Sequence, residues 1–386
     1  MTRLIEILIS LAIVVALFLL VGVLLPGSRH HRESVETNRK LTIVYDTINS
    51  LRRFEDWNPL VLRDPNIQIE KSGPDSGVGA RLEYSSDTNL GEGSWEIVAN
   101  EPRKSVSYAL TDPEPGNNKR TTYSLKPTGR AGRNVEITQT YDVDYGWNLL
   151  GRYAGMYVSS NVGADMRLGL QRMSNMLAAV PNYDYADLSK DDPEMAPRLQ
   201  DRPAENLLFV SAAVPRDNEA VAKQMLSNLE WIRRVMASNN LEAAGPVRII
   251  TNEFGAESYS FDVAMPVRKR SGGSSDDEQD GNADAADEGD ESEQAAETEV
   301  AAVEYPELTG LKLDGPVEYV RSPASQVAVV PFTGHMANLA VVRDALRAWA
   351  LTQGFETAER PYELWKSGIE GGFEEDGEFE VVWSVR

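Results

Sequence analysis

The chain of 386 residues contains no cysteine. Without thiols there can be no disulfide bridge, no cysteine nucleophile and no thiolate metal site, although the compartment is not fixed by this absence. Histidine is almost as scarce, because the sequence holds only His30, His31 and His335. Three histidines leave almost nothing from which to build a histidine-rich metal site or a catalytic triad. We therefore expect no metal and no cofactor, and the sequence nominates no catalytic residue.

Basic residues are outnumbered, with 38 Lys and Arg against 60 Asp and Glu and a net charge of −22. An acidic chain repels the phosphate backbone, and no basic domain offsets this repulsion. The sequence also lacks a helix-turn-helix pattern, which disfavours direct control of transcription. We therefore expect no nucleic-acid partner.

Residues 4–25 form a long apolar run in which Glu6 is the only charged side chain. About 20 apolar residues in a helix cross about 30 Å of hydrocarbon. A cleaved signal peptide would end in an Ala-x-Ala pattern, which is missing after Leu25, and a buried soluble helix would carry a polar stripe. The sequence predicts that residues 1–28 are an uncleaved transmembrane anchor and that residues 4–25 contact the lipid bilayer.

The charges that flank this run indicate its orientation. Arg3 is the only basic residue before it. The basic residues that follow it are Arg29, Arg32, Arg39 and Lys40. The positive-inside rule then favours a single-pass protein of a bacterial inner membrane with its soluble domains in the cytoplasm. Glu33 and Glu36 reduce the asymmetry, so the periplasm remains the alternative.

Two interruptions divide the rest of the chain. Residues 271–299 carry twelve acidic side chains and no basic or aromatic one, so they cannot bury enough apolar area to offset the entropy of ordering. Their carboxylates lack EF-hand spacing, which favours a solvated loop over a calcium or basic-partner site. Acids and prolines in residues 181–203 indicate a linker. We predict domains at 29–180 and 204–386, the second containing a disordered acidic loop over 270–303.

The first domain alternates between strand and helix patterns. Period-two alternation predicts a strand over 29–38, and helical spacing predicts a short helix over 41–48. Further strands are predicted over 67–71, 80–86, 93–100, 105–111, 121–127 and 135–143. Apolar residues at three- and four-residue spacing predict one long helix over 149–179.

This order resembles the polyketide cyclase/dehydrase branch of the SRPBCC (START-like, helix-grip) superfamily over residues 29–180. The motifs that carry the resemblance lie at 54–59, 72–74, 77–80, 91–93, 95–97, 101–102 and 150–153. The resemblance implies a curved antiparallel sheet that grips a long helix, with a cavity between them for an apolar or amphipathic small molecule.

Aromatic and methionine side chains are the candidate lining residues of that cavity. They are Trp57, Trp95, Tyr108, Tyr123, Tyr141, Tyr153, Met156 and Tyr157. A stripe of this kind is more often ordinary core, which is the alternative interpretation. The domain shows no acid–base pair at an interpretable spacing, and a shared fold does not imply shared chemistry.

The second domain contains an internal repeat, because residues 206–268 and 324–386 share one pattern of strand, helix, strand and strand. In the first copy these elements are predicted at 207–215, 219–238, 247–250 and 259–267. In the second copy they are predicted at 326–332, 338–353, 360–365 and 378–385. Two β-α-β-β copies predict a pseudo-symmetric sheet with helices on one face.

This pattern resembles the GyrI-like (AraC effector-binding) domain, as do Pro361-Tyr362-x-x-Trp365 and Met265-Pro266-Val267. The acidic loop has no counterpart in that family. The resemblance implies a groove where aromatic side chains and a buried acid hold a cationic or aromatic compound. The residues it nominates are Tyr362, Glu363, Trp365 and Trp383, with Glu380 as a further acid. These acids can equally face solvent. His335 is expected to cap the helix that follows it or to face water, and not to take part in chemistry.

The sequence thus predicts an α+β chain with a transmembrane helix, a helix-grip domain and a two-repeat GyrI-like domain. The favoured function is a membrane-anchored protein that binds or senses a hydrophobic or amphipathic small molecule without catalysis. An enzyme that uses the helix-grip cavity for cyclisation, hydrolysis or dehydration is one alternative. An envelope scaffold without a ligand is the other, and the protein partner is left open.

Overall fold

The structure is a computed structural model that describes residues 2–190, 192–255, 257–270 and 305–386. The chain forms two compact units. The first comprises residues 1–196 and 344–357, and the second comprises residues 197–343 and 358–386. The predicted acidic loop, 270–303, lies outside the described residues except for its first position.

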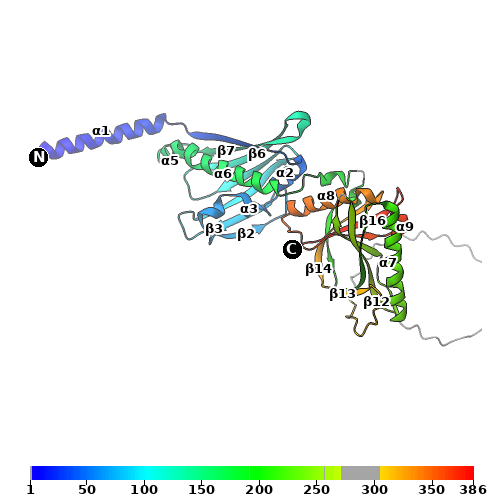
Figure 1. The fold of residues 1–386 in the computed structure, drawn as a ribbon. Helices are drawn as coiled ribbons and strands as arrows, with labels where there is room; N and C mark the ends of the chain where they lie inside the picture. Colours follow the sequence, from blue (N-terminus) through cyan, green and yellow to red (C-terminus); the bar gives the residue numbers. More distant parts are fainter. Residues whose placement is uncertain (1, 191, 256, 271–304) are drawn as a thin grey trace, which may run out of the picture. The chain divides into compact units, whose positions relative to one another are not determined.

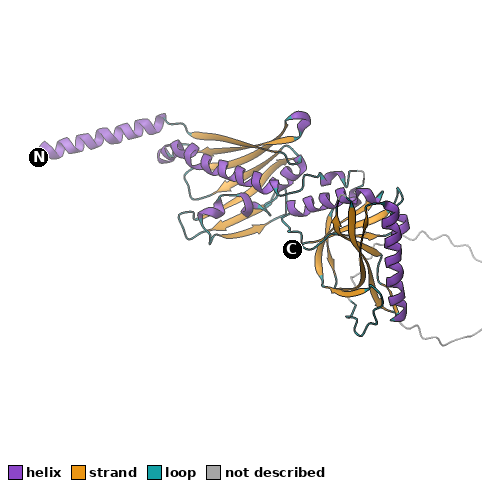
Figure 2. Cartoon of the chain, in the orientation of Figure 1, coloured by secondary structure: helices purple, strands orange, loops and turns teal. Residues whose placement is uncertain are grey.

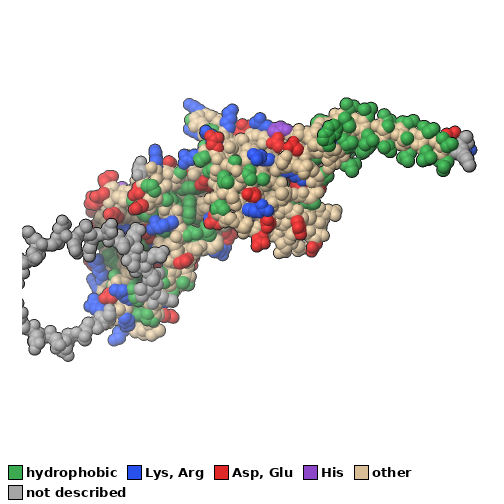
Figure 3. Space-filling model, turned by 180° about the vertical axis from the view of Figure 1, so that it is seen from behind, with side chains coloured by type: hydrophobic (Ala, Val, Ile, Leu, Met, Phe, Trp, Pro, Cys, Tyr) green, Lys and Arg blue, Asp and Glu red, His purple; other side chains and the backbone are tan. Residues whose placement is uncertain are grey.

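The chain begins with a long apolar helix, α1 (Thr2–Leu24). Hydrophobic side chains cover the helix along its length (Figure 3). Among the described residues it is the one helix that is long and apolar enough to cross a membrane. A signal sequence near the N-terminus also meets these criteria of length and composition, so α1 is a candidate span.

The first unit is built on a seven-stranded antiparallel sheet in the order β1-β7-β6-β5-β4-β3-β2. The strands are β1 (Ser28–Thr37), β2 (Gln68–Ser72), β3 (Arg81–Ser85), β4 (Glu92–Glu101), β5 (Ser105–Thr111), β6 (Asn117–Thr128) and β7 (Asn134–Asp144). Side chains alternate between buried and exposed along β5, β6 and β7. This period of two is what covers one face of a sheet and leaves the other in water. All the strands predicted for this domain are present (Figure 2).

Helices cover the buried face of this sheet. They are α2 (Leu41–Ile48), α3 (Phe54–Trp57), α4 (Leu60–Arg63), α5 (Leu149–Ala154) and α6 (Val158–Ala178). The helix α6 packs against β1 and β7 and runs along the sheet (Figure 1).

The single helix predicted over 149–179 is wrong in one respect, because a 3₁₀ turn at Gly155–Tyr157 separates α5 from α6. At this break Gly155 lies against the ring of Tyr145, where an added Cβ would be 2.7 Å from a ring carbon. Hydrophobic periodicity does not reveal such a contact.

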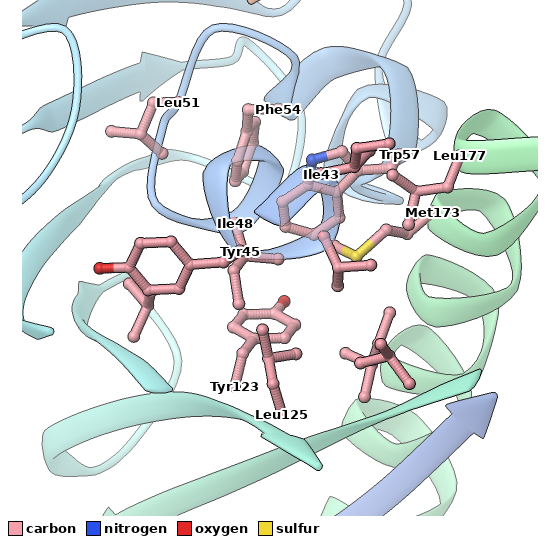
Figure 4. Packing of buried hydrophobic residues seen from close by; sticks show 14 of the residues in the cluster. Ile43, Tyr45, Ile48, Leu51, Phe54, Trp57, Tyr123, Leu125, Met173 and Leu177 are labelled. Carbon is pink, nitrogen blue, oxygen red and sulfur yellow. The ribbon is translucent and has the colours of Figure 1, made fainter. Parts of the chain in front are cut away.

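Five aromatic side chains form the centre of the first unit and are named here the five-aromatic cluster. They are Phe54, Trp57, Trp95, Tyr108 and Tyr123. Each ring contacts two others, with centroids 5.1–5.9 Å apart and planes inclined by 64–82°. Edge-to-face packing of this kind contributes beyond simple area burial. Figure 4 shows three of these residues packed among side chains of α2, β6 and α6.

The second unit is built on a nine-stranded sheet in the order β13-β9-β12-β11-β15-β16-β14-β8, with β10 paired to β12. The strands are β8 (Arg198–Arg202), β9 (Glu205–Pro215), β10 (Leu241–Ala243), β11 (Val247–Phe254), β12 (Ser258–Lys269), β13 (Glu318–Ser322), β14 (Ser325–Thr333), β15 (Tyr362–Trp365) and β16 (Glu378–Ser384). The helices are α7 (Asn218–Ser238), α9 (Gly368–Gly371) and the start of α8 (Leu339–Thr352), of which the residues from 344 onward belong to the first unit. The sheet is curled, and α7 packs against β9 and β12.

The strand order of the second unit is the same when it is read outward in either direction from the β11/β15 pair. In the first repeat β11 pairs with β12, and β12 pairs with β9. In the second repeat β15 pairs with β16, and β16 pairs with β14. The outermost strands are exchanged, because β8 precedes the first repeat but pairs with β14, whereas β13 precedes the second repeat but pairs with β9.

The segment predicted as a linker, 181–203, therefore ends in a sheet strand. Its earlier part is also packed, because Tyr185 is buried and its hydroxyl donates a 2.6 Å hydrogen bond to Asp46. The acids and prolines of this segment indicate irregular backbone, and they do not show whether that backbone is packed.

The hydrogen bond of Tyr108 tests the importance of the five-aromatic cluster. Its hydroxyl is fully buried and donates to the carbonyl oxygen of Ile48, at the end of α2. In Tyr108→Phe this carbonyl loses its partner, and we expect the free energy of unfolding to fall by about 1–3 kcal/mol. Urea unfolding followed by tryptophan fluorescence measures the change. Tyr183→Phe, at an exposed position, should leave stability unchanged, and equal effects would contradict this account.

Candidate functional site

A cavity of about 620 Å³ lies within the first unit. Its walls come from α3 and α4, from the strands β3 to β7 and their loops, and from α5, α6 and the turn between them. It lies between the sheet and its covering helices and is partly open to solvent. Its volume is within the range of pockets for drug-sized ligands, about 300–1,000 Å³.

The walls of the cavity combine apolar and polar side chains. The apolar lining residues are Trp57, Pro59, Leu60, Tyr84, Leu90, Trp95, Leu110, Pro113, Pro115, Tyr123, Tyr141, Tyr145, Ala154, Tyr157, Val158, Val162 and Met166, and the polar ones are Asn58, Arg63, Thr88, Asn89, Thr111, Asp112, Glu114, Thr121, Gln139, Asn161 and Asp165. Gly169 of α6 lies close to Pro59, because an added Cβ would be 3.1 Å from Pro59 Cδ. A wall of this composition suits an amphipathic ligand, with an apolar body and polar groups.

The structure brings five of the nominated side chains of this domain to the cavity wall. They are Trp57, Trp95, Tyr123, Tyr141 and Tyr157. Tyr108 is absent from the wall and is fully buried in the five-aromatic cluster. Tyr153 lies against α1, where its ring stacks on Phe18, and Met156 is 46% exposed.

Several polar groups on the wall were not nominated from the sequence. The amide nitrogen of Gln139 donates a 3.0 Å hydrogen bond to the hydroxyl of Thr121, and both residues are buried. Burial raises the pKa of Tyr84 to about 12 and also raises that of Tyr141. Both phenols are therefore neutral near pH 7 and can donate a hydrogen bond to a ligand.

Two ion pairs involve residues of the cavity wall, which are Arg63, Asp165 and Asp112. Arg63 of α4 donates to Asp165 of α6, and burial raises the pKa of Asp165 against the opposing effect of Arg63. Lys119 is buried and donates to Asp112. Asp165 lies between Val162 and Gly169 on the apolar stripe of α6, so an acid within an apolar stripe is the sequence pattern that could have predicted it as a cavity residue. The sequence around Arg63, Lys119 and Asp112 shows no such pattern.

In the second unit Glu363 is almost completely buried on β15. Its Oε1 lies 3.2 Å from Nη1 of Arg343, which also donates to Thr251. Burial raises the pKa of Glu363 to about 7, and the nearby guanidinium opposes this shift. Trp365 lies on the same face two residues later, and its ring packs edge-on to Phe379 with centroids 5.2 Å apart.

Tyr362 lies on the opposite face, because neighbouring residues of a strand point to opposite sides. The guanidinium groups of Arg248 and Arg202 lie 5.1 and 5.9 Å from its ring centroid. Glu380 shares this face and forms ion pairs with Arg202 and Lys366. The structure thus places Tyr362 and Glu380 on one face of the sheet and Glu363 and Trp365 on the other. Trp383 shares the face of Glu363, because it follows Val381, the partner of Glu363, by two residues on β16.

His335 acts as a cap. Its Nδ1 accepts a 3.1 Å hydrogen bond from the backbone nitrogen of Ala337, at the turn that leads into α8. This confirms the role expected for it. In the part of the chain that the structure describes, no group of three or more His, Asp and Glu side chains is arranged to hold a metal ion.

The raised pKa of Glu363 predicts a pH dependence of stability. Between pH 4.5 and about 7 the folded state retains a proton that the unfolded state releases, so the free energy of unfolding falls as pH rises through this window. A shift from 4.5 to about 7 corresponds to about 3 kcal/mol. Glu363→Gln cannot titrate, and we expect it to lose less stability than the wild type between pH 5 and pH 8 in urea unfolding.

Glu378→Gln is the matched control for this experiment, because Glu378 is exposed on β16. It should show the pH dependence of the wild type. Identical pH dependence in both variants would show that Glu363 is ionised normally in the folded protein.

Comparisons with known proteins identify the first unit. Residues 29–177 match the family described as polyketide cyclase/dehydrase and lipid transport. No curated protein matches the chain. Among solved structures, truncated norcoclaurine synthase from Thalictrum flavum is 12% identical, with 39% of this chain and 94% of that chain covered and a TM-score of 0.31.

Two further structures show similarity at the same level. A protein from Chromobacterium violaceum is 13% identical, with 38% of this chain and 95% of that chain covered and a TM-score of 0.29. The C-terminal domain of EcmrR is 14% identical, with 49% and 96% covered and a TM-score of 0.33. Scores this low do not transfer function. Residues 29–177, by their family match, form an SRPBCC polyketide cyclase domain.

Proposed function

We propose that the protein is a membrane-anchored receptor that binds a hydrophobic or amphipathic small molecule in the cavity of its first unit, without catalysis. The observation that carries this proposal is the cavity of about 620 Å³. Small-molecule sites are usually concave, with an apolar wall and polar groups that fix the ligand's orientation, and this cavity offers both. The match of residues 29–177 to a family that includes lipid transport supports the same class of ligand.

The wall indicates the chemistry of the ligand. Trp57, Trp95, Tyr123 and Tyr157 are proposed to contact its apolar body. The neutral phenols of Tyr84 and Tyr141 favour a ligand that carries a hydrogen-bond acceptor beside its apolar part.

The helix α1 supplies the anchor in this proposal. Lipophilic compounds concentrate in a bilayer, so a binding domain tethered there meets its ligand at high local concentration. The charges around α1 favour a cytoplasmic position for the soluble units. Protease digestion of intact cells tests this orientation, because cleavage from outside would place those units in the periplasm.

The second unit is proposed to act as a GyrI-like effector-binding module. Glu363 and Trp365 would form its site, with Trp383 on the same face. The pairing of Glu363 with Arg343 reduces the negative charge available to a cationic ligand. This module is therefore the secondary binding site of the proposal, and the cavity of the first unit is the primary one.

A substitution that fills the cavity tests the proposed function. Val162 is half-buried and lines the cavity from α6, so the indole in Val162→Trp should occupy the ligand's space. In the wild type, a ligand at 100 times its Kd adds about 2.7 kcal/mol of stability, which is readily seen as a higher Tm. We expect Val162→Trp to lose this rise in thermal unfolding with a panel of lipids, quinones and aromatic cations.

Leu168→Trp is the matched control. Leu168 lies on the same helix but is 45% exposed and does not line the cavity, so the variant should keep the ligand-induced rise in Tm. Absence of any rise in the wild type with the whole panel would refute ligand binding. An equal rise in both variants would place the ligand outside the cavity.

An enzyme is the second candidate, and Asp165 is the observation that favours it. This carboxyl lines the cavity, and burial raises its pKa, as is common for catalytic acids. If the protein is an enzyme, Asp165→Asn should abolish conversion of a captured ligand while keeping the rise in Tm. Mass spectrometry of the ligand after incubation measures conversion, and an unchanged ligand with the wild type removes this candidate.

A further inference from the structure

Residues 147–157, named here the α5 segment, leave four large apolar side chains in solvent. Trp147 is 80% exposed, Leu150 70%, Tyr157 60% and Met156 46%. Single exposed hydrophobic residues are common on protein surfaces, but several gathered on one short segment indicate an interaction surface.

The α5 segment is fixed to the end of α1 by hydrogen bonds. The guanidinium group of Arg152 donates to the carbonyl oxygens of Gly22, Val23 and Leu25 at 3.3, 2.9 and 3.1 Å. The last carbonyls of a helix have no partner within it and carry partial negative charge, which a cation neutralises. Arg152 therefore ties α5 to the point where α1 ends.

Close packing accompanies these hydrogen bonds. The ring of Tyr153 stacks on that of Phe18 with centroids 4.5 Å apart, and its hydroxyl donates a 2.7 Å hydrogen bond to the carbonyl oxygen of Phe18. Gly22 allows this approach, because an added Cβ would lie 3.2 Å from Cβ of Leu149. The short helix α5 thus lies directly beside the last turns of α1.

This contact defines a depth once α1 crosses a bilayer. The 22 residues Arg3–Leu24 extend about 33 Å, close to the 30 Å thickness of the hydrocarbon. Phe18 precedes Leu24 by six residues, so it lies about 9 Å below the end of the span. Tyr153 touches Phe18, and α5 therefore reaches the depth of about 5–10 Å at which interfacial helices lie.

The side chains of the α5 segment suit that depth. Trp and Tyr are enriched at the boundary between lipid headgroups and hydrocarbon. Arg152, whose guanidinium carbon lies 5.3 Å from the ring centroid of Trp147, can extend its charge toward the headgroups from such a position. Leu150 and Met156 add apolar area that only hydrocarbon would bury.

We propose that the α5 segment is a membrane-docking element that inserts into the headgroup region of the lipid bilayer beside α1. Tyr157 belongs both to this exposed surface and to the cavity wall, to which Ala154 and Val158 also contribute. Docking therefore places that wall of the cavity at the membrane surface, where a bilayer lipid can enter without crossing water. This inference rests on the membrane anchor and the lipid-like ligand of the proposed function.

Site-directed labelling tests the docking, because a chain without cysteine accepts a single label at any chosen position. Trp147→Cys and Leu150→Cys, made separately in the full chain, are labelled with an environment-sensitive fluorophore. The protein is reconstituted into liposomes of phosphatidylcholine and phosphatidylglycerol. Both labels should be quenched by lipids that carry a nitroxide near the headgroup, and iodide in the water should quench them several-fold less than the control.

Val78→Cys is the control, because Val78 is 56% exposed. The backbone nitrogen of its neighbour Gly77 donates a hydrogen bond to the carbonyl oxygen of Asn49, just beyond the end of α2. In the sequence, β1 and α2 lie between this point and α1. Iodide quenching at 147 and 150 equal to that at 78 would overturn the proposal, as would failure of the chain to stay with the liposomes. The use of two positions keeps the test valid if one variant folds poorly.

Ligand retention is measured on the same preparations by native mass spectrometry. Labels in water on a protein that still holds a lipid would refute docking and leave the binding function intact. Labels in the membrane on a protein without any ligand would support docking and contradict the binding function.

Discussion

The packing of the five-aromatic cluster is the interaction on which the first unit depends, because these rings form both the centre of its core and part of the cavity wall. Its rings connect α3 to three neighbouring strands through a closed circuit of edge-to-face contacts. Trp57, Trp95 and Tyr123 belong to this circuit and also line the cavity. The same side chains therefore stabilise the fold and form one end of the site, which means that substituting them changes both properties. Substitutions on α6 can change the site alone, because residues of α6 line the cavity but do not belong to the five-aromatic cluster.

Much of this unit could be predicted from the sequence, because several of its strands alternate between apolar and polar residues, as a half-buried sheet requires. Alternation identifies the face of a strand, but it does not identify what covers that face. Tyr108 and Tyr123 lie on the same side of the sheet, yet α2 covers the first and the cavity borders the second. Likewise, the turn between α5 and α6 directs Tyr153 to α1 and Tyr157 to the cavity, and helical spacing alone did not separate these two tyrosines.

The second unit shows a related limit. Its repeats were visible as a pattern of elements, but the edge strands β8 and β13 are short, and their partners lie far away in the sequence. Pairing over such distances is set by the finished sheet and leaves no local signal. Period-two geometry also separates Tyr362 from Glu363, so a motif that names both residues cannot describe a single site on this strand. Arginines accompany both residues, because Arg343 forms an ion pair with Glu363 and the guanidinium group of Arg248 lies over the ring of Tyr362.

The apolar helix α1 and the cavity are connected through α5, which touches α1 on one side and leads into the wall of the cavity on the other. The central claim is that this cavity holds an apolar ligand taken from the membrane environment. Native mass spectrometry of the full chain, extracted in a mild detergent, tests it most directly. The account predicts one hydrophobic molecule per chain that survives detergent exchange and is released on collisional activation. A spectrum that shows only the mass of the bare chain under the same conditions would contradict it.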